Sequence, residues 1–468
     1  MRALLSVSLI ICFSLLTFGQ SDNLSSVLRF NEYLGYVKRF HPIVKQAELV
    51  IDQSQAKLMQ SRGAFDPKIE VDYDRKKFRE SEYWDKLNAT FKIPTWYGLE
   101  MKVNFEENTG DFLNPESLVP KDGLYSAGIK FSVLQGLLIN DRMAQLKQAK
   151  LFREQAKADR DLLINTILFE ASLVYFKWLQ AYNEHELFRN FLANAEKRFQ
   201  GVKRGAELGQ FAPIDSTEAR IIVSDRELSF EQTRIRLIKA TLKLSTYLWL
   251  ENNIPVQLQP DIIPDINSEA IIDDTFNIHT LVSDSLLIDN NPKLLSLDYK
   301  LQNLEVNRRL KANRLLPKLD LEYNFLTETG GVFNSYNTAN YKAGINFSLP
   351  LFLRKERGDF QVAKLKVHNA KLEIDATRVT LLNKIDALRQ ELDSYVIQNG
   401  ITHQMVTDTA RLLKAEERKF QVGESSLFLV NTREAKLIES HLKAIKLQSI
   451  FFETKAKLFN SIAMNPEF

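Results

Sequence analysis

Histidines and carboxylates are the residues of this chain that could support chemistry, but their spacing argues against a reaction centre. The six histidines lie far apart, at positions 41, 185, 279, 368, 403 and 441. His185-Glu186 lacks a second histidine four residues after the first, so it is not a zinc-protease motif. The single cysteine, Cys12, excludes an intramolecular disulfide and a CxxC metal site. GxSxG, GxGxxG and P-loop motifs are absent. We therefore expect no catalytic residue, no metal and no cofactor.

Two acidic pairs have a structural interpretation. Asp72 and Asp74 follow PKIEV at 67–71, and Asp320 and Glu322 alternate with leucines in PKLDLEY at 317–323. Successive side chains of a strand point to opposite faces, so these carboxylates share one polar strand face. A wetted face explains them better than a catalytic dyad.

The opposite strand face is apolar and carries aromatic residues near its ends. A soluble sandwich alternates in this way, and so does a transmembrane barrel with lipid outside and water inside. The N-terminal signal peptide and the helices predicted beside the strands favour the barrel. The residues predicted to face lipid are Ile69, Val71, Tyr73, Ile129, Phe131, Leu321, Tyr323, Ile345 and Phe347.

The N-terminus resembles a secretory signal peptide. Arg2 precedes an apolar run at 3–16, and the small residues Thr17 and Gly19 lie just before Gln20. Cys12 lies inside the apolar run without a lipobox, so we expect a mature chain that carries no lipid. After Gln20 no stretch approaches 18 uninterrupted apolar residues, which predicts that strands span the membrane.

The chain contains two tandem repeats. His41-Pro42 recurs as Asn291-Pro292, and Pro67-Lys68 recurs at the same offset as Pro317-Lys318. YSAGIKFS at 125–132 likewise recurs as YKAGINFS at 341–348. The first repeat adds an alternating hairpin at 87–105, so it contributes either two strands with an outer hairpin or four strands.

Long amphipathic helices follow the strands. Apolar residues between Ile167 and Val202 recur at 4-3 spacing, as in a coiled coil. Residues 221–249 carry two apolar rows about 200° apart, which predicts a neighbour on each side, as in the wall of a cylinder. A helix over 141–205 would be about 100 Å long. The 62 basic and 59 acidic residues nearly balance, which gives no electrostatic case for nucleic-acid binding.

In the order of these duplicated motifs the chain resembles the TolC family of outer-membrane efflux and secretion channels. Gly209, Asp215 and Ala219 match the family's helical turn, whereas the turn at Gly423 has Leu429 and Arg433 at the corresponding positions. The resemblance implies a mixed α/β membrane protein, in which a trimeric barrel continues into a periplasmic helical tunnel. Four strands per protomer would give twelve, and six would give eighteen.

The function implied by the resemblance is passive conduction across the outer membrane. The implied partners are two further copies, a periplasmic adaptor protein, an inner-membrane pump of the RND or ABC type, and outer-membrane lipid. A soluble periplasmic coiled-coil adaptor or scaffold is the alternative, and a secreted enzyme would need a reaction centre that the sequence lacks.

The predicted organisation follows the repeats. It comprises a signal peptide (1–19), leading helices (20–65), strands with the hairpin (66–134), long helices (135–250), an equatorial linker (251–275), and a second set of leading helices (276–316), strands (317–352) and long helices (353–464).

The periplasmic tips are the predicted gate and adaptor site. Gly205, Gly209 and Gly423 should mark the helical turns, with adaptor docking at 203–214 and 421–427. We expect an apolar constriction formed by Leu427, Leu429 and Val430, supported by ion pairs of Asp215 and Glu218. The alternative is a polar ring in which Asn431 and Glu434 turn inward.

Overall fold

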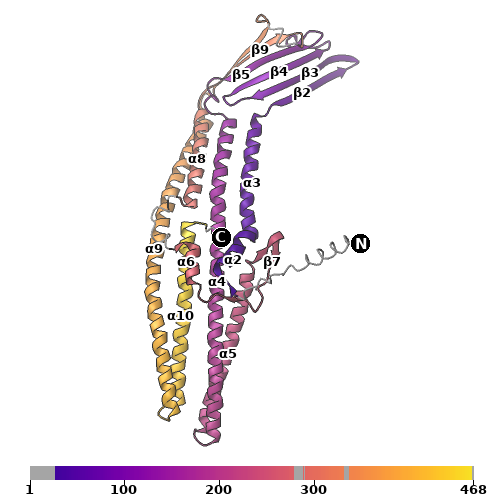
Figure 1. Ribbon diagram of the computed structural model, residues 1–468. Helices are drawn as coiled ribbons and strands as arrows, with labels where there is room; N and C mark the ends of the chain where they lie inside the picture. The colour runs from indigo at the N-terminus through magenta and orange to yellow at the C-terminus, as the bar shows by residue number, and fades with distance from the viewer. Residues whose placement is uncertain (1–26, 279–287, 289, 331–336, 466–468) are drawn as a thin grey trace, which may run out of the picture.

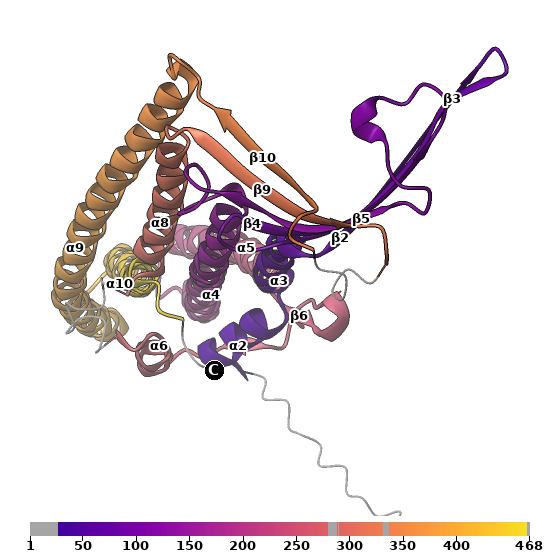
Figure 2. The same cartoon turned by 90° about the horizontal axis from the view of Figure 1, so that it is seen from above.

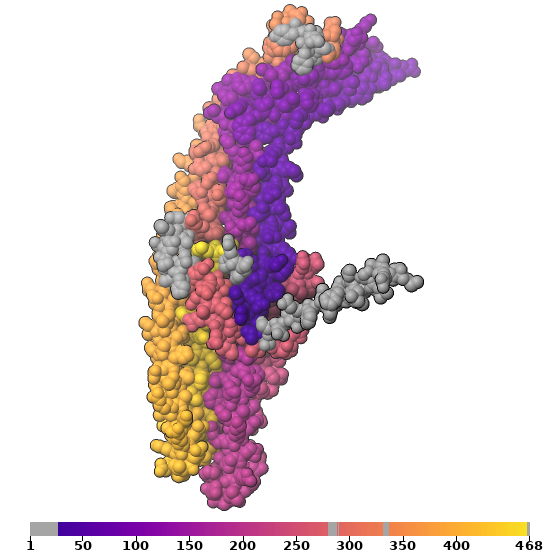
Figure 3. Space-filling view, viewed as in Figure 1, coloured from indigo at the N-terminus to yellow at the C-terminus, as the bar shows by residue number. Residues whose placement is uncertain are grey.

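The protein is elongated, with a β-sheet at one end and long helices below it (Figures 1 and 3). The computed structural model describes residues 27–278, 288, 290–330 and 337–465. The predicted signal peptide and His279 lie outside the described residues. Seen along its length, the helices form a curved wall rather than a compact bundle (Figure 2).

One antiparallel sheet unites the strands of both repeats in the order β10-β9-β5-β4-β3-β2. The strands are β2 (Lys68–Phe78), β3 (Ser81–Pro94), β4 (Leu99–Thr109), β5 (Leu124–Ser132), β9 (Lys318–Thr327) and β10 (Tyr341–Ser348). The predicted hairpin 87–105 corresponds to β3 and β4, which are longer than predicted and pair within the sheet. The first repeat therefore contributes four strands.

Four helices stand side by side beneath the sheet, in the order α3 (Pro42–Arg62), α4 (Asp141–Glu207), α8 (Pro292–Asn313) and α9 (Arg354–Gln421). In the lower half the order is α5 (Pro213–Ser245), α4, α10 (Leu427–Ile462) and α9. Because α4 and α9 contain 67 and 68 residues, each runs through both halves. At 1.5 Å per residue each is about 100 Å long.

Short elements surround the middle of the molecule, where the two halves meet. They are β1 (Val27–Leu28), α2 (Phe30–Phe40), β6 (Trp249–Leu250), β7 (Ile254–Pro255), β8 (Ile263–Pro264) and α6 (Glu269–Phe276). Most of the predicted linker 251–275 is therefore structured, and β1 pairs in parallel with β8. The start of the described chain is thus joined to the segment between the repeats.

An aromatic core lies at this equator. Phe30 stacks on Phe176 with ring centroids 5.2 Å apart, and Phe276 stacks on Phe459 at 4.7 Å. The buried Tyr175 donates a hydrogen bond of 2.9 Å to the carbonyl oxygen of Leu28. These contacts bring helices of both repeats together with the equatorial segments. Buried aromatic pairs contribute about 0.5–1.5 kcal/mol each beyond the burial of their area.

Helix α4 also contains a stretch that is long and apolar enough, by length and composition alone, to cross a membrane. Half of that stretch is buried inside the protein, and α4 supplies Tyr175, Phe176 and Trp178 to the aromatic core. Packing in this core accounts for its apolar character.

The two repeats use equivalent caps for their leading helices. Nδ1 of His41 accepts a hydrogen bond from the Ile43 N–H at 3.2 Å, and Oδ1 of Asn291 accepts one from the Lys293 N–H at 2.9 Å. Pro42 and Pro292 follow the caps, at a helix position where no backbone donor is needed. His41 is buried against Tyr247 and Trp249, and this burial lowers its pKa.

His41→Asn should remove the pH dependence of stability at the start of α3 but keep the N-cap hydrogen bond. Since the folded-state pKa lies below the unfolded value of 6.5, the unfolded chain binds the proton more tightly, and stability falls as the pH drops below that value. The protection factors of amides at the start of α3, which correct for the slower intrinsic exchange at low pH, should therefore be smaller at about pH 5.5 than at about pH 8 in the wild type. The difference between wild type and variant should grow on acidification, and a constant difference would contradict the role of His41.

Candidate functional site

The sheet has one continuous apolar face. The register aligns Ile69, Phe91, Val103, Ala127, Phe325 and Tyr341 in one row across all six strands. All nine residues predicted to face lipid lie on this face. Ile69 and Ile345 are each 76% exposed, so no described helix covers their side chains. An uncovered apolar surface of this extent requires an apolar environment.

The opposite face is polar and joined by ion pairs between strands. Lys92 pairs with Glu70, and Ser132 donates a hydrogen bond of 2.7 Å to the buried Asp320. Lys102 on β4 reaches Glu322 on β9 at 3.5 Å, passing the intervening strand at Gly128. The acidic residues of β9 are therefore partners in charge pairs across the sheet, whereas Asp72 and Asp74 lie on the edge strand β2.

Neighbouring residues of β10 allow the two faces to be compared at one depth. Ile345→Lys should destabilise the membrane-inserted protein by about 2–4 kcal/mol, because it places a charge on the predicted lipid face. Asn346→Lys is the matched control and should have little effect, since it adds the same charge to the polar face. The measurement is denaturant unfolding in lipid vesicles. Equal losses in the two variants would argue against lipid contact.

Glycines form the turns at the far ends of the helices. Gly209 and Gly423 have φ values of +75° and +81°, which favour glycine in a left-handed helix end. Gly205, in contrast, lies inside α4 and not at the turn. An added Cβ there would come within 2.4 Å of the Phe211 ring. Phe211 stacks on Phe420 with a centroid distance of 5.4 Å, so contact between the α4–α5 and α9–α10 hairpins explains this glycine.

The residues predicted to form the constriction occupy different environments. Leu427 is buried against Val202 and Ala219, and Val430 is buried in a second cluster between the hairpins. Leu429 is 40% exposed. Leu427 and Val430 therefore hold the two hairpins of one chain together, and Leu429 alone of the predicted apolar trio is available to a neighbouring copy.

Within the described part of the chain, the two acidic residues predicted to support the constriction make hydrogen bonds and no ion pair. Oδ2 of Asp215 accepts from the Ala212 N–H at 3.2 Å, which caps α5. Oε1 of Glu218 accepts from Nδ2 of Asn431 at 3.0 Å. The expected ion-pair role is corrected to helix capping for Asp215 and to a link between the hairpins for Glu218.

Glu434 is the centre of a buried charge network. Its side chain is 1% exposed and contacts Arg198 of α4 at 2.5 Å and Arg226 of α5 at 3.4 Å. Arg198 also lies 3.4 Å from Oδ1 of Asn431. Asn431 and Glu434 thus pack between the hairpins within one chain, which argues against the polar-ring alternative. Sequence reasoning missed both arginines, because more than 200 residues separate them from Glu434.

Glu434→Ala should weaken the contact between the hairpins by about 3–5 kcal/mol, because it leaves two guanidinium groups without their buried carboxylate. Hydrogen exchange in α10 near the tip should rise while exchange in the sheet stays unchanged. Glu439→Ala is the matched control. Glu439 also contacts two cations, Lys436 and Lys443, each at 2.8 Å, but its side chain is 48% exposed. A comparable response to both substitutions would contradict the importance of burial.

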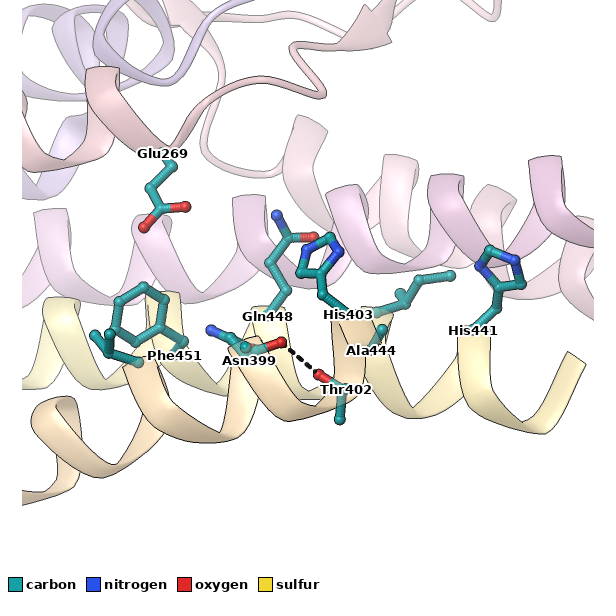
Figure 4. A pocket seen from close by; sticks show the side chains of 11 residues that line it. Glu269, Asn399, Thr402, His403, His441, Ala444, Gln448 and Phe451 are labelled. Atoms are coloured by element: carbon teal, nitrogen blue, oxygen red, sulfur yellow. Dashed lines mark hydrogen bonds between the residues drawn. The ribbon is translucent and has the colours of Figure 1, made fainter. Parts of the chain in front are cut away.

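A groove between α9 and α10 contains polar side chains near the equator (Figure 4). Its lining includes Glu269, Asn399, His403, His441 and Gln448, and the two histidines lie apart along it. Burial lowers the pKa of His441, which favours its neutral form. Among the described residues, no group of three His, Asp or Glu side chains has an arrangement that could hold a metal ion.

The sheet has one apolar and one polar face, and it continues into a wall of long helices. Residues 285–449 match the family described as "Outer membrane efflux protein". No curated protein shows detectable sequence similarity to the chain. The family match covers about a third of the chain, and it confirms the predicted resemblance to this family.

Solved structures support this fold over nearly the whole chain. The Campylobacter jejuni CmeC outer membrane channel is 13% identical, with a TM-score of 0.65 over 94% of this chain and 86% of that chain. The outer membrane protein VceC from Vibrio cholerae is 13% identical, with a TM-score of 0.64 over 94% and 97%. The open state of the Neisseria gonorrhoeae MtrE outer membrane channel is 10% identical, with a TM-score of 0.64 over 93% and 89%.

Proposed function

We propose that this protein is the outer-membrane channel of an efflux or secretion system and conducts solutes passively through the helical wall and the sheet. One observation carries the proposal: the sheet has an uncovered apolar face and a polar face linked by ion pairs, and it stands on a wall about 100 Å long. A channel through a membrane needs these two faces, whereas a soluble adaptor would have to cover the apolar one.

A closed conduit requires more than one copy. One of the two apolar rows predicted within 221–249 begins with Ile221, Leu228, Ile235 and Leu242, and these four residues are exposed along the free side of α5. On the other free side of the wall and at the same level as α5, the lower half of α9 exposes Ile397, Ile401 and Leu412. These unlike sides can pair head to tail, which generates a ring. The number of three copies comes from the family resemblance.

The tips supply an apolar surface for a periplasmic adaptor. Leu208, Ile214, Val422 and Phe428 are all exposed at or next to the two turns. These residues lie in or beside the predicted docking segments 203–214 and 421–427. Docking there would connect the conduit to an inner-membrane pump, and the apolar side chains indicate that burial of apolar area drives the contact.

The closed state of the tip involves Leu429. Three copies of this half-exposed residue would meet near the axis and exclude water from a narrow opening. Leu427 and Val430 support the constriction indirectly, since they fix the hairpins to each other. Glu434 is buried and paired with two arginines, so it presents no free carboxylate to the lumen.

Single-channel recording of the purified protein in planar bilayers tests the proposed function. The wild type should open rarely, and Leu429→Ser should increase the conductance or the open time several-fold. Multivalent cations added at the tip side should block weakly. Thr432→Ser is the control, as a mild polar change one turn away. Absence of conductance in every variant would refute the channel, whereas strong cation block would refute the apolar gate alone.

A further inference from the structure

The sheet indicates a barrel wider than the twelve strands that the family resemblance implies. We propose that three sheets of six strands close into an eighteen-stranded barrel, in which β2 of each copy pairs antiparallel with β10 of the next. The inference rests on the trimer of the proposed function. It adds the number of strands and the residues that meet at the β2–β10 junction.

The edges of the sheet require such a junction. Every residue of β2 and β10 is exposed, whereas the inner strands are mostly half-buried. β2 and β10 are the two edge strands, so each presents backbone N–H and C=O groups without a partner in the sheet. A spanning sheet must pair these groups within the hydrocarbon, and closure achieves it. The chain runs away from the helices along β2 and back toward them along β10. When β2 of one copy lies beside β10 of the next, the two strands are therefore antiparallel.

The two faces restrict the register of the junction. Apolar residues of β10 must lie beside apolar residues of β2, because a shift by one residue would put charges on the lipid face. Lys68 of the first repeat is equivalent to Lys318 of the second. Within one chain, Ser348 of β10 pairs with Lys318. The same flush arrangement across the junction places Ser348 opposite Lys68. It then aligns Phe347 with Ile69 and Ile345 with Val71.

Charge then selects among the allowed registers. In the flush register Lys342 lies opposite Asp74, and a slip of two residues toward the helices places it opposite Asp72. A slip of two residues the other way places it opposite Lys76, and like charges directly opposite destabilise a strand pair. The described residues offer no salt-bridge partner to Lys342, Asp72 or Asp74 within the chain. The carboxylates of the β2 edge and the ammonium group of the β10 edge are therefore complementary.

The width of the helical wall supports six strands per copy. With a strand spacing of about 4.8 Å and a tilt of about 40°, six strands cover about 38 Å of circumference. Four adjacent helices cover about 32–40 Å at ordinary packing distances. Four strands would cover only about 25 Å. The β3–β4 hairpin therefore brings the sheet to the width of the four helices beneath it.

Disulfide trapping in the intact outer-membrane protein tests both parts of the inference. The expected mature chain has no cysteine, so any disulfide that forms must join two introduced cysteines. Asp74→Cys with Lys342→Cys should link neighbouring copies into covalent dimers and trimers on oxidation. Lys76→Cys with Lys342→Cys is the register control and should link several-fold less. Asn104→Cys with Ser126→Cys, a pair of Cα partners on β4 and β5, should link within one chain in the same membranes.

The outcomes separate the inference from the proposed function. Formation of both the Asp74–Lys342 and the Asn104–Ser126 links supports eighteen strands. A junction link without the β4–β5 link would mean that the hairpin lies outside the barrel, which overturns the proposal. Lys342→Cys is also combined with Asp72→Cys. If neither this variant nor Asp74→Cys with Lys342→Cys forms a disulfide between copies, the proposal is overturned. Export by the reduced variants is measured in parallel, and retained export shows that the channel function stands whichever links form.

Discussion

The backbone groups along the two free edges of the sheet constrain the whole molecule. Water can pair such groups in a soluble protein, but hydrocarbon cannot. A sheet with an apolar face and open edges is therefore incomplete as a single chain. The same incompleteness continues below it, where α5 and α9 leave apolar rows uncovered on opposite sides of the wall. The free edges of the sheet and the free sides of the helical wall lie on the same two sides of the chain. One rotation that relates neighbouring copies can therefore cover both.

The equatorial core explains how a wall one helix thick remains rigid within one chain. Helices α4 and α10 reach it from different repeats, and α2 and α6 close it from outside. Its stacked rings are contributed by segments far apart in the sequence, so the two repeats cannot separate without exposing them. Nearer the tip, a buried charge network also joins the helices, because Glu434 accepts hydrogen bonds from arginines of two helices. The equatorial contact is apolar and non-directional, whereas the contact near the tip adds a buried carboxylate with directional hydrogen bonds to its apolar clusters.

Periodicity made much of this fold predictable. Strict alternation placed Ile69, Ile129 and Ile345 on one face, and the recurrence of His41-Pro42 as Asn291-Pro292 located both capped helices. Local patterns fail where distant residues decide. Gly205 looked like a turn residue, but its function depends on Phe211 packing against it. Leu427 and Leu429 look alike in sequence, and only the packing of α4 and α5 shows that one is buried and the other is not. Arg198 and Arg226 gave no signal, because charged residues on long helices usually face solvent.

The β3–β4 hairpin illustrates how an oligomeric wall can change size. An inserted hairpin leaves and re-enters the sheet on the same side of the membrane, so every later element keeps its orientation. In the proposed trimer, threefold symmetry would multiply the insertion, so one short segment of about thirty residues would add six strands at once. Pore diameter in such an assembly cannot be adjusted gradually by adding strands. It changes in steps fixed by the symmetry, and finer adjustment is left to the side chains that line the polar face.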